Sequence, residues 1–206
     1  MTLPTRTLLL LAALLLPVAS AQAAVRARSV EVEAFWGRTE LSGARRAIDD
    51  SRDAIAGSVQ GLRAGWMASP HVGFCLSYGT FSDSLTRATF AGPRSVKLHE
   101  RLADASVEYH FKPHEMTVWV ARGGAGWSGV SPGGGDTATA HAAFGVKLAL
   151  TERLYLRPDL LARWYVQDDQ HLHGGSHVDW EATVGIGFTF GARTDKSLGL
   201  PPPPRS

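Results

Sequence analysis

The feature that most constrains this chain is a run near its end, Val178–Phe190, in which apolar and polar side chains alternate almost without a break. One face of the run is apolar and consists of Val178, Trp180, Ala182, Val184, Ile186, Phe188 and Phe190. The other face consists of Asp179, Glu181, Thr183, Gly185, Gly187 and Thr189. A two-residue period over this length predicts a β-strand, because a helix repeats about every 3.6 residues. An apolar face opposite a face with carboxylates is typical of strands in transmembrane β-barrels.

The first 23 residues have the features of a secretory signal peptide. Arg6 gives a positive start, residues 8–16 are apolar, and Ala21-Gln22-Ala23 is a cleavage sequence of the A-x-A type. The apolar stretch falls well short of the ~20 residues that a membrane-spanning helix needs, which argues against an N-terminal anchor. We therefore expect export of the chain, with residues 1–23 removed, residues 24–190 folded as one domain and residues 191–206 forming a tail.

Charge and cysteine content narrow the classes of protein. The chain has 21 Lys and Arg against 19 Asp and Glu, a formal net charge of +2, so no binding of nucleic acid is expected. Its single cysteine, Cys75, excludes a scaffold held by intramolecular disulfides. Charged residues or glycines interrupt every apolar run after the signal peptide. If the mature chain enters a membrane, it must therefore do so as a closed barrel.

Seven further runs have strand character. They cover residues 30–41, 58–67, 71–81, 100–111, 115–127, 140–150 and 153–166. In the fifth run two faces compete, because Val118 and Val120 are as apolar as Trp119 and Ala121. In the seventh run Pro158 cannot donate a ladder hydrogen bond, which predicts a bulge or an unbonded position. Aromatic residues suited to the membrane interface are Trp36, Trp66, Tyr78, Tyr109, Trp164, Trp180 and Phe190.

The connections between the runs alternate in length. Residues 68–70, 112–114 and 151–152 are short turns, whereas residues 42–56, 82–97, 131–137 and 167–177 are predicted long loops. Outer-membrane barrels have this rhythm, with tight periplasmic turns and long extracellular loops. A soluble lipocalin-type barrel, the alternative, gives no reason for it. The sequence therefore predicts an all-β fold: an eight-stranded antiparallel up-and-down transmembrane β-barrel.

Three segments carry a resemblance to a known family. They are Leu156-Arg157-Pro158-Asp159-Leu160, the Gly-rich segment Val120 to Trp127, and the closing segment Val184 to Phe190. With these segments the chain resembles the small outer-membrane β-barrels that include OmpA-like membrane domains and opacity-type porins. The resemblance implies residence in the outer membrane of a Gram-negative bacterium, among outer-membrane lipid and lipopolysaccharide, after insertion by the barrel-assembly machinery. It also implies a structural or surface-interaction role without enzymatic activity, in which the long loops contact an extracellular ligand.

The segment after Phe190 differs from the end of many such barrels, which close on an aromatic residue. Residues 191–206 contain four consecutive prolines, Pro201 to Pro204, and are expected to form an extended periplasmic tail. In OmpA-like proteins a Pro-rich linker leads to a peptidoglycan-binding domain, and the printed sequence ends where such a domain would begin. Cell-wall binding is therefore not carried over from the resemblance.

The inward faces of the predicted strands carry charges of both signs. The predicted lumenal charge network consists of Glu31, Glu33, Arg63, Asp104, Glu108, Lys147, Arg157, Asp159, Arg163, Asp179 and Glu181, with His141 beside it. An eight-stranded barrel is just wide enough to be filled by its side chains. Opposite charges in so narrow a lumen predict a plug of ion pairs, not an open channel.

Two kinds of chemistry remain as alternatives to this structural role. Glu31, Glu33, Asp179 and Glu181 lie on strands that become neighbours on closure and could act as paired carboxylates, although buried ion pairs more often explain such groups. His171, His173 and His177 are weak candidates for a zinc or copper site, but histidines in a solvated loop are the simpler interpretation. We expect no catalytic residue, no cofactor and no metal.

The enzymes to be weighed here are the outer-membrane lipid A deacylases, which resemble this architecture and carry a catalytic His-x-Ser on a late strand. The matching segment here, Arg163-Trp164-Tyr165-Val166, contains neither residue. Ser176 beside His177 is the local substitute, and it has no defined third partner. A lipid-modifying hydrolase is thus kept as the alternative function.

Overall fold

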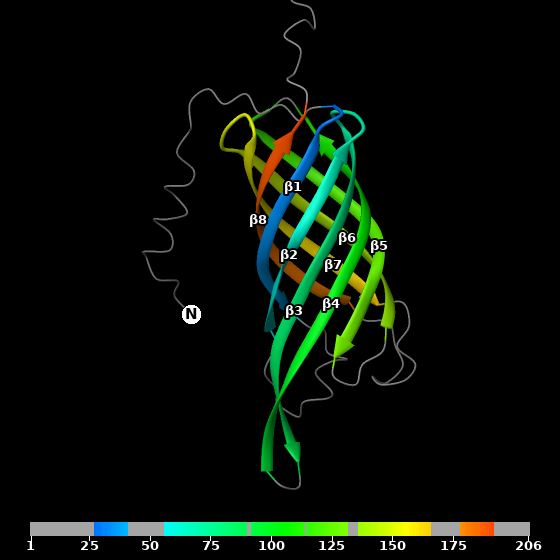
Figure 1. Ribbon diagram of the computed structural model, residues 1–206, viewed down its shortest axis with the longest axis vertical. Helices are drawn as coiled ribbons and strands as arrows, with labels where there is room; N and C mark the ends of the chain where they lie inside the picture. The colour runs from blue at the N-terminus through cyan, green and yellow to red at the C-terminus, as the bar shows by residue number, and fades with distance from the viewer. Residues whose placement is uncertain are drawn as a thin grey trace, which may run out of the picture.

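The described residues form one closed β-barrel (Figure 1). The structure is a computed structural model and describes residues 27–40, 56–89, 92–113, 115–131, 136–165 and 178–191. The strands of this part are β1 Val30–Glu40, β2 Ala56–Met67, β3 Val72–Thr89, β4 Gly92–Phe111, β5 Thr117–Ser131, β6 Asp136–Ala149, β7 Leu154–Tyr165 and β8 Val178–Phe190. Each strand pairs antiparallel with its neighbours in the chain, and β8 pairs with β1 from Phe190↔Val30 to Trp180↔Glu40. The predicted eight-stranded antiparallel barrel is confirmed.

The two faces of the sheet are inverted relative to a soluble protein. Large apolar side chains cover the outside, with Leu76 65% exposed and Leu62 60% exposed, and the seven aromatic residues predicted for the membrane interface are all exposed there. The charged side chains of the strands are mainly buried inside. This arrangement suits a protein whose outer solvent is hydrocarbon, and it excludes the lipocalin-type alternative. Within the described ranges no helix is long and apolar enough to cross a membrane.

The charge of Arg122 determines which face of the ambiguous fifth run points inward. Trp119 and Trp127 lie on the outside of β5, while Val118 and Val120 are buried inside. Arg122 shares the inward face of these valines and reaches a lumenal carboxylate, so the whole strand takes this orientation. The two valines pack with Met67 in an apolar cluster inside the barrel.

The prediction of a long loop at residues 82–97 is wrong. β3 and β4 continue as a paired hairpin from Ser82↔His99 to Thr89↔Gly92, and this hairpin projects beyond the rest of the barrel (Figure 1). β2 reaches β3 only as far as Ser82, so the extension pairs with itself alone. The sequence of residues 82–97 holds Gly92-Pro93 and scattered charges, so the regular alternation of the other strands is missing there.

Pro158 is accommodated without a bulge. The register of β7 against β8 runs unbroken through Pro158↔Val184. The ladder between β6 and β7 is interrupted between the pairs Gly145↔Asp159 and Leu148↔Leu156 and resumes in the same register. Of the two predicted accommodations, the structure adopts the unbonded position.

Three short connections define one end of the barrel, here called the turn end: residues 68–71, 112–116 and 150–153. Local hydrogen bonds hold them. The Ser69 hydroxyl accepts from the Val72 amide at 3.0 Å, and the Thr151 hydroxyl accepts from the Leu154 amide at 2.9 Å. Outward aromatic pairs lie near this end, including Trp66 stacked on Phe74 with ring centroids 6.0 Å apart. Such pairs suit the membrane interface.

Candidate functional site

The candidate site is the charged interior of the barrel, which we call the lumen. Because side chains alternate between the two faces of a strand, every second residue of each strand points inward. The structure places all the residues of the predicted lumenal charge network on these inward faces, each no more than 9% exposed. They come from six strands: Glu31 and Glu33 from β1, Arg63 from β2, Asp104 and Glu108 from β4, Lys147 from β6, Arg157, Asp159 and Arg163 from β7, and Asp179 and Glu181 from β8.

Two arginines, Arg63 and Arg157, form the ion pairs in the middle of the lumen. Arg63 Nη1 lies 2.5 Å from Glu33 Oε1 and 2.8 Å from Asp159 Oδ2. Arg157 Nε lies 3.1 Å from Asp159 Oδ1, and its Nη1 lies 2.9 Å from Glu108 Oε1. Asp159 therefore accepts hydrogen bonds from both guanidinium groups. Burial of these charges is compatible with folding because each has an opposite charge and a hydrogen bond.

Arg163 organises a second cluster. Its Nη1 and Nη2 donate to the two carboxylate oxygens of Asp104 at 2.7 and 3.0 Å, and its Nε donates to Glu181 at 2.8 Å. The paired contact with Asp104 uses the planar fork of the guanidinium, a geometry that lysine cannot reproduce. His141 lies beside this cluster, with Nδ1 3.7 Å from Asp104 Oδ1.

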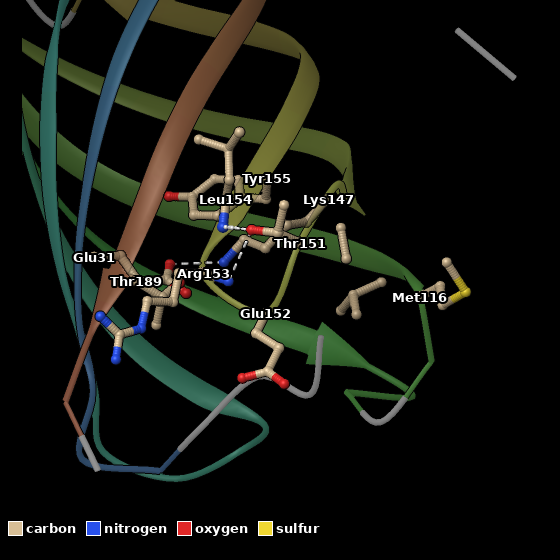
Figure 2. A pocket seen from close by; sticks show the side chains of 11 residues that line it. Glu31, Met116, Lys147, Thr151, Glu152, Arg153, Leu154, Tyr155 and Thr189 are labelled. Carbon is tan, nitrogen blue, oxygen red and sulfur yellow. Dashed lines mark hydrogen bonds and ion pairs between the residues drawn. The ribbon is translucent and has the colours of Figure 1, made fainter. Parts of the chain in front are cut away.

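A third contact lies at the turn end of the lumen. Lys147 Nζ lies 2.7 Å from Glu31 Oε2 and 4.6 Å from the centre of the Tyr155 ring. Figure 2 shows these residues around a small pocket whose rim is formed by the 150–153 turn and Thr189. The Thr189 amide donates to the Arg153 carbonyl at 2.8 Å, which ties β8 to this turn.

Several inward polar residues were missed by the sequence analysis. Arg122 Nη2 lies 3.4 Å from Asp159 Oδ2, and it went unnoticed because the face of its strand was ambiguous. Glu100 accepts from the Tyr165 hydroxyl at 3.0 Å and also from the Ser128 hydroxyl. His110 Nε2 lies 3.3 Å from Glu108 Oε2. The alternation of β4 and β7 already placed Glu100, His110 and Tyr165 inward, and only their pairing required the closed barrel.

Glycines make room for the carboxylates. A Cβ atom at Gly145 would lie 2.9 Å from Asp159 Cγ, and one at Gly185 would lie 2.9 Å from Glu33 Cγ. Larger residues at these two positions would displace the charged groups. Glycine within a strand weakens it, so close approach of a neighbouring side chain is the physical reason for these two.

Three of the four carboxylates weighed as a catalytic pair form ion pairs. Glu31, Glu33 and Glu181, proposed as paired carboxylates, each contact a different cation: Lys147, Arg63 and Arg163 respectively. Within the ranges that the structure describes, no three His, Cys, Asp or Glu side chains are placed to hold a metal ion.

Some predicted residues lie outside the described part of the chain. These are the loop histidines His171, His173 and His177 with Ser176, the signal peptide, residues 192–206 of the tail and most of the predicted loops 42–56, 131–137 and 167–177. The predictions made for them therefore stay predictions.

The family model of the OprF membrane domain matches residues 6–194. Outer membrane porin F of Pseudomonas aeruginosa is 26% identical over 182 residues, which cover 85% of this chain and 48% of the porin. The chain thus spans about half the length of this curated relative.

Solved structures show the same fold. The N-terminal β-barrel domain of P. aeruginosa OprF matches with a TM-score of 0.54 and 20% identity, covering 80% of this chain and 98% of that domain. The outer membrane protein OprG of P. aeruginosa matches with a TM-score of 0.57 and 12% identity, covering 84% and 100%. Neisserial surface protein A matches with a TM-score of 0.54 and 16% identity, covering 79% and 96%.

Proposed function

This chain belongs to the OprF membrane domain family and resides in the bacterial outer membrane, and on that premise we propose that it is a structural barrel with a plugged lumen. Its loops on the side opposite the turn end make contacts at the cell surface, where an extracellular ligand binds. Its other partners are outer-membrane lipid, lipopolysaccharide and the barrel-assembly machinery. The related porin is a longer protein, so solute passage is not carried over from its name.

One observation carries the proposal of a plug: the ion pairs run across the lumen and not only along its wall. Arg157 and Arg163 on β7 reach Glu108 and Asp104 on β4, and Lys147 on β6 reaches Glu31 on β1. In a ring of eight strands, partners three strands apart lie on nearly opposite walls. Side chains that meet there occupy the space through which a solute would have to pass.

The test is conductance in planar lipid bilayers. We expect the purified protein to give at most small and rare steps. The variant Arg63→Ala with Asp159→Ala removes the crossing Arg63–Asp159 pair, together with the contacts of these two residues to Glu33, Arg122 and Arg157, without changing the net charge. We expect this variant to conduct more. The control is Lys112→Ala with Glu115→Ala, an exposed pair 3.3 Å apart at the turn end, which should behave as the unmodified protein does.

The net charge of the buried lumenal side chains adds a prediction of ion selectivity to this test. The buried cations of the described part are Arg63, Arg122, Lys147, Arg157 and Arg163, and the buried carboxylates are Glu31, Glu33, Glu100, Asp104, Glu108, Asp159, Asp179 and Glu181. Carboxylates outnumber cations, so the steps of the Arg63→Ala, Asp159→Ala variant should favour cations. Large and stable single-channel steps from the unmodified monomer would contradict the plug.

A lipid-modifying hydrolase is the second candidate, and one contact favours it. Ser82 Oγ lies 3.1 Å from His99 Nδ1, and both side chains are exposed on the outer side of the barrel. A serine nucleophile needs a base that a third group orients, and within the described ranges His99 contacts no carboxylate. Mass spectrometry of lipid A from cells with the unmodified gene and with Ser82→Ala separates the candidates. The structural proposal expects the same acyl chains in both.

A further inference from the structure

The lumen contains two clusters of apolar side chains besides its charges. The Phe35 cluster lies on β1, β2 and β4 and consists of Phe35, Val59 and Leu102. The Met67 cluster lies on β2 and β5 and consists of Met67, Val118 and Val120. All these side chains are on the inward faces of their strands, and none is more than 7% exposed. They do not balance any buried charge, so another physical role has to explain them.

The two clusters lie at different depths of the lumen, with central ion pairs between them. Along β2 the chain passes from Val59 through Arg63 to Met67 as it approaches the turn end. On β1, Glu33 is the register partner of Arg63, and Phe35 lies further from the turn end than Glu33. Position along a strand determines depth, because the strands form the wall of the barrel. The Arg63–Glu33 ion pair therefore lies between two apolar layers.

Phe35 extends its cluster over several strands. Its ring lies over the guanidinium of Arg63, with 4.2 Å between Arg63 Cζ and the ring centre. It also covers Gly61 and Gly79, which are register partners on β2 and β3. A Cβ atom at Gly61 would lie 2.6 Å from Phe35 Cζ, and one at Gly79 would lie 3.3 Å from the same atom. The ring thus occupies space that two glycines leave free, and Leu102 continues the apolar layer to β4.

The opposite wall contributes to the same layer. Leu161 on β7 is 4% exposed and lines a small cavity together with the three residues of the Phe35 cluster. In a ring of eight strands, β7 is opposite β3, so these apolar groups face one another across the lumen. The cavity measures about 10 Å³, which is room for about one water molecule. A hydrated ion does not fit at this level, and an ion without its water is unfavourable beside apolar side chains.

We propose that the two apolar clusters separate the central ion pairs from water and small ions at both ends of the lumen, with Phe35 as the residue that blocks ions on the side opposite the turn end. The inference rests on the proposed plug and adds a second barrier to it. The ion pairs fill space, whereas the apolar layers exclude the water that an ion carries. Hydrophobic constrictions block ions in channels by this second means.

The first test extends the measurement in planar bilayers. Two barriers in series predict that Phe35→Ala combined with Arg63→Ala and Asp159→Ala gains more conductance than the sum of the gains from Phe35→Ala alone and from the Arg63→Ala, Asp159→Ala variant. Phe35→Leu in the same background keeps an apolar side chain and should restore most of the block. The matched control is Phe144→Ala, which removes the same ring from the outer surface, where it is 52% exposed, and should add nothing.

The natural cysteine lies between the two clusters and reports on water access. Cys75 is on the inward face of β3 and is 4% exposed. The next inward residue away from the turn end is Ser77, the register partner of Arg63. The next inward residue toward the turn end is Gly73, the register partner of Met67. A small water-soluble reagent must therefore pass one of the two clusters to reach the thiol.

The second test measures modification of Cys75 by the cation 2-aminoethyl methanethiosulfonate, followed as an increase in mass of the folded full-length protein in detergent. The unmodified protein should resist the reagent, and Phe35→Ala and Met67→Ala should each react faster. Phe144→Ala should react as the unmodified protein does, and heat-dependent gel mobility shows that each variant has folded.

The outcomes separate this inference from the plug itself. Large conductance steps from the unmodified protein would contradict the plug. With the unmodified protein closed, equal conductance of the variants with and without Phe35→Ala in the Arg63→Ala, Asp159→Ala background would overturn the second barrier. Rapid modification of Cys75 in the unmodified protein would overturn it as well, because water would then already reach the space between the clusters.

Discussion

Single buried arginines determine how the charges of the lumen are balanced. Arg163 satisfies Asp104 with two hydrogen bonds and Glu181 with a third, and it is only 2% exposed. A buried ion pair contributes little net stability relative to apolar residues of the same size, but removing one partner leaves an uncompensated charge. Loss of Arg163 alone would leave the charges of Asp104 and Glu181 buried without a partner. The free-energy cost of that loss therefore exceeds the net contribution of the intact ion pairs to the stability of the fold.

Replacement of Arg163 by methionine should consequently destabilise the barrel by about 3 to 5 kcal/mol. The measurement is the free energy of unfolding from urea titrations of protein refolded into lipid vesicles. Adding Asp104→Asn and Glu181→Gln should recover most of the loss, because no bare charge then remains buried. Arg101→Met, on the outer surface, is the control and should stay within ~0.5 kcal/mol. Equal stability of the Arg163→Met variant and the unmodified protein would show that water reaches Asp104 and Glu181.

The sequence was sufficient to place these residues inside but not to assign their partners. Period-two alternation puts Arg157, Asp159 and Arg163 on one face of a strand, whatever the rest of the chain does. The partners Glu108 and Asp104 lie 49 and 59 positions earlier in the chain and come within reach only through closure of the ring. Arg122 was missed because both faces of its strand are apolar in the sequence. The charge of Arg122, and not the residues beside it, shows which face of the strand points inward.

At the scale of one strand, two adjacent residues of β3 lie on opposite faces, one outside the barrel and one inside. Leu76 is 65% exposed on the outside, in the row of Val32, Ala64 and Ala105, and Ser77 points inward with its hydroxyl 3.4 Å from Asp104. Leu76→Lys should cost about 2 to 4 kcal/mol and impair assembly, because it places a charge in hydrocarbon. Ser77→Lys should assemble, because Asp104 can pair with the new cation. Heat-dependent gel mobility of protein refolded into vesicles distinguishes the two, and equal tolerance would mean that this face of β3 does not contact lipid.

Element boundaries were predictable where lipid adjoins the strand and not elsewhere. β8 has the bounds that its alternation predicts, since its outward face lies against hydrocarbon along its length. Beyond Ser82 and His99 the β3–β4 hairpin leaves the ring and pairs only with itself. Polar strands without a required apolar face look like loops in the sequence, which is why residues 82–97 were assigned wrongly.

At the scale of the whole molecule, the seam between β8 and β1 is equivalent to the other strand pairs. It runs from Val30↔Phe190 to Glu40↔Trp180, and β1 pairs with β2 over the same 11 residues. The chain ends of the barrel meet there, because a Cβ atom on Gly191 would lie 3.1 Å from Ser29 Cα. Closure thus removes every unpaired strand edge, which the membrane interior requires.

A circular permutant should therefore fold to the same barrel. Joining Gly191 to Arg28 through a short Gly-Ser linker and opening the chain within residues 132–135 changes the order of the strands in the sequence but none of their neighbours. Chain ends at exposed connections are generally tolerated when no buried backbone pairing is cut. We expect the permutant to refold in detergent with an unchanged β-sheet circular dichroism spectrum and with heat-dependent mobility. The control permutant, opened between Val107 and Glu108 in β4, cuts a strand that pairs on both sides and should fail. Failure of the first permutant would contradict this expectation. It would show that assembly depends on the order of the strands in the sequence as well as on the closed ring.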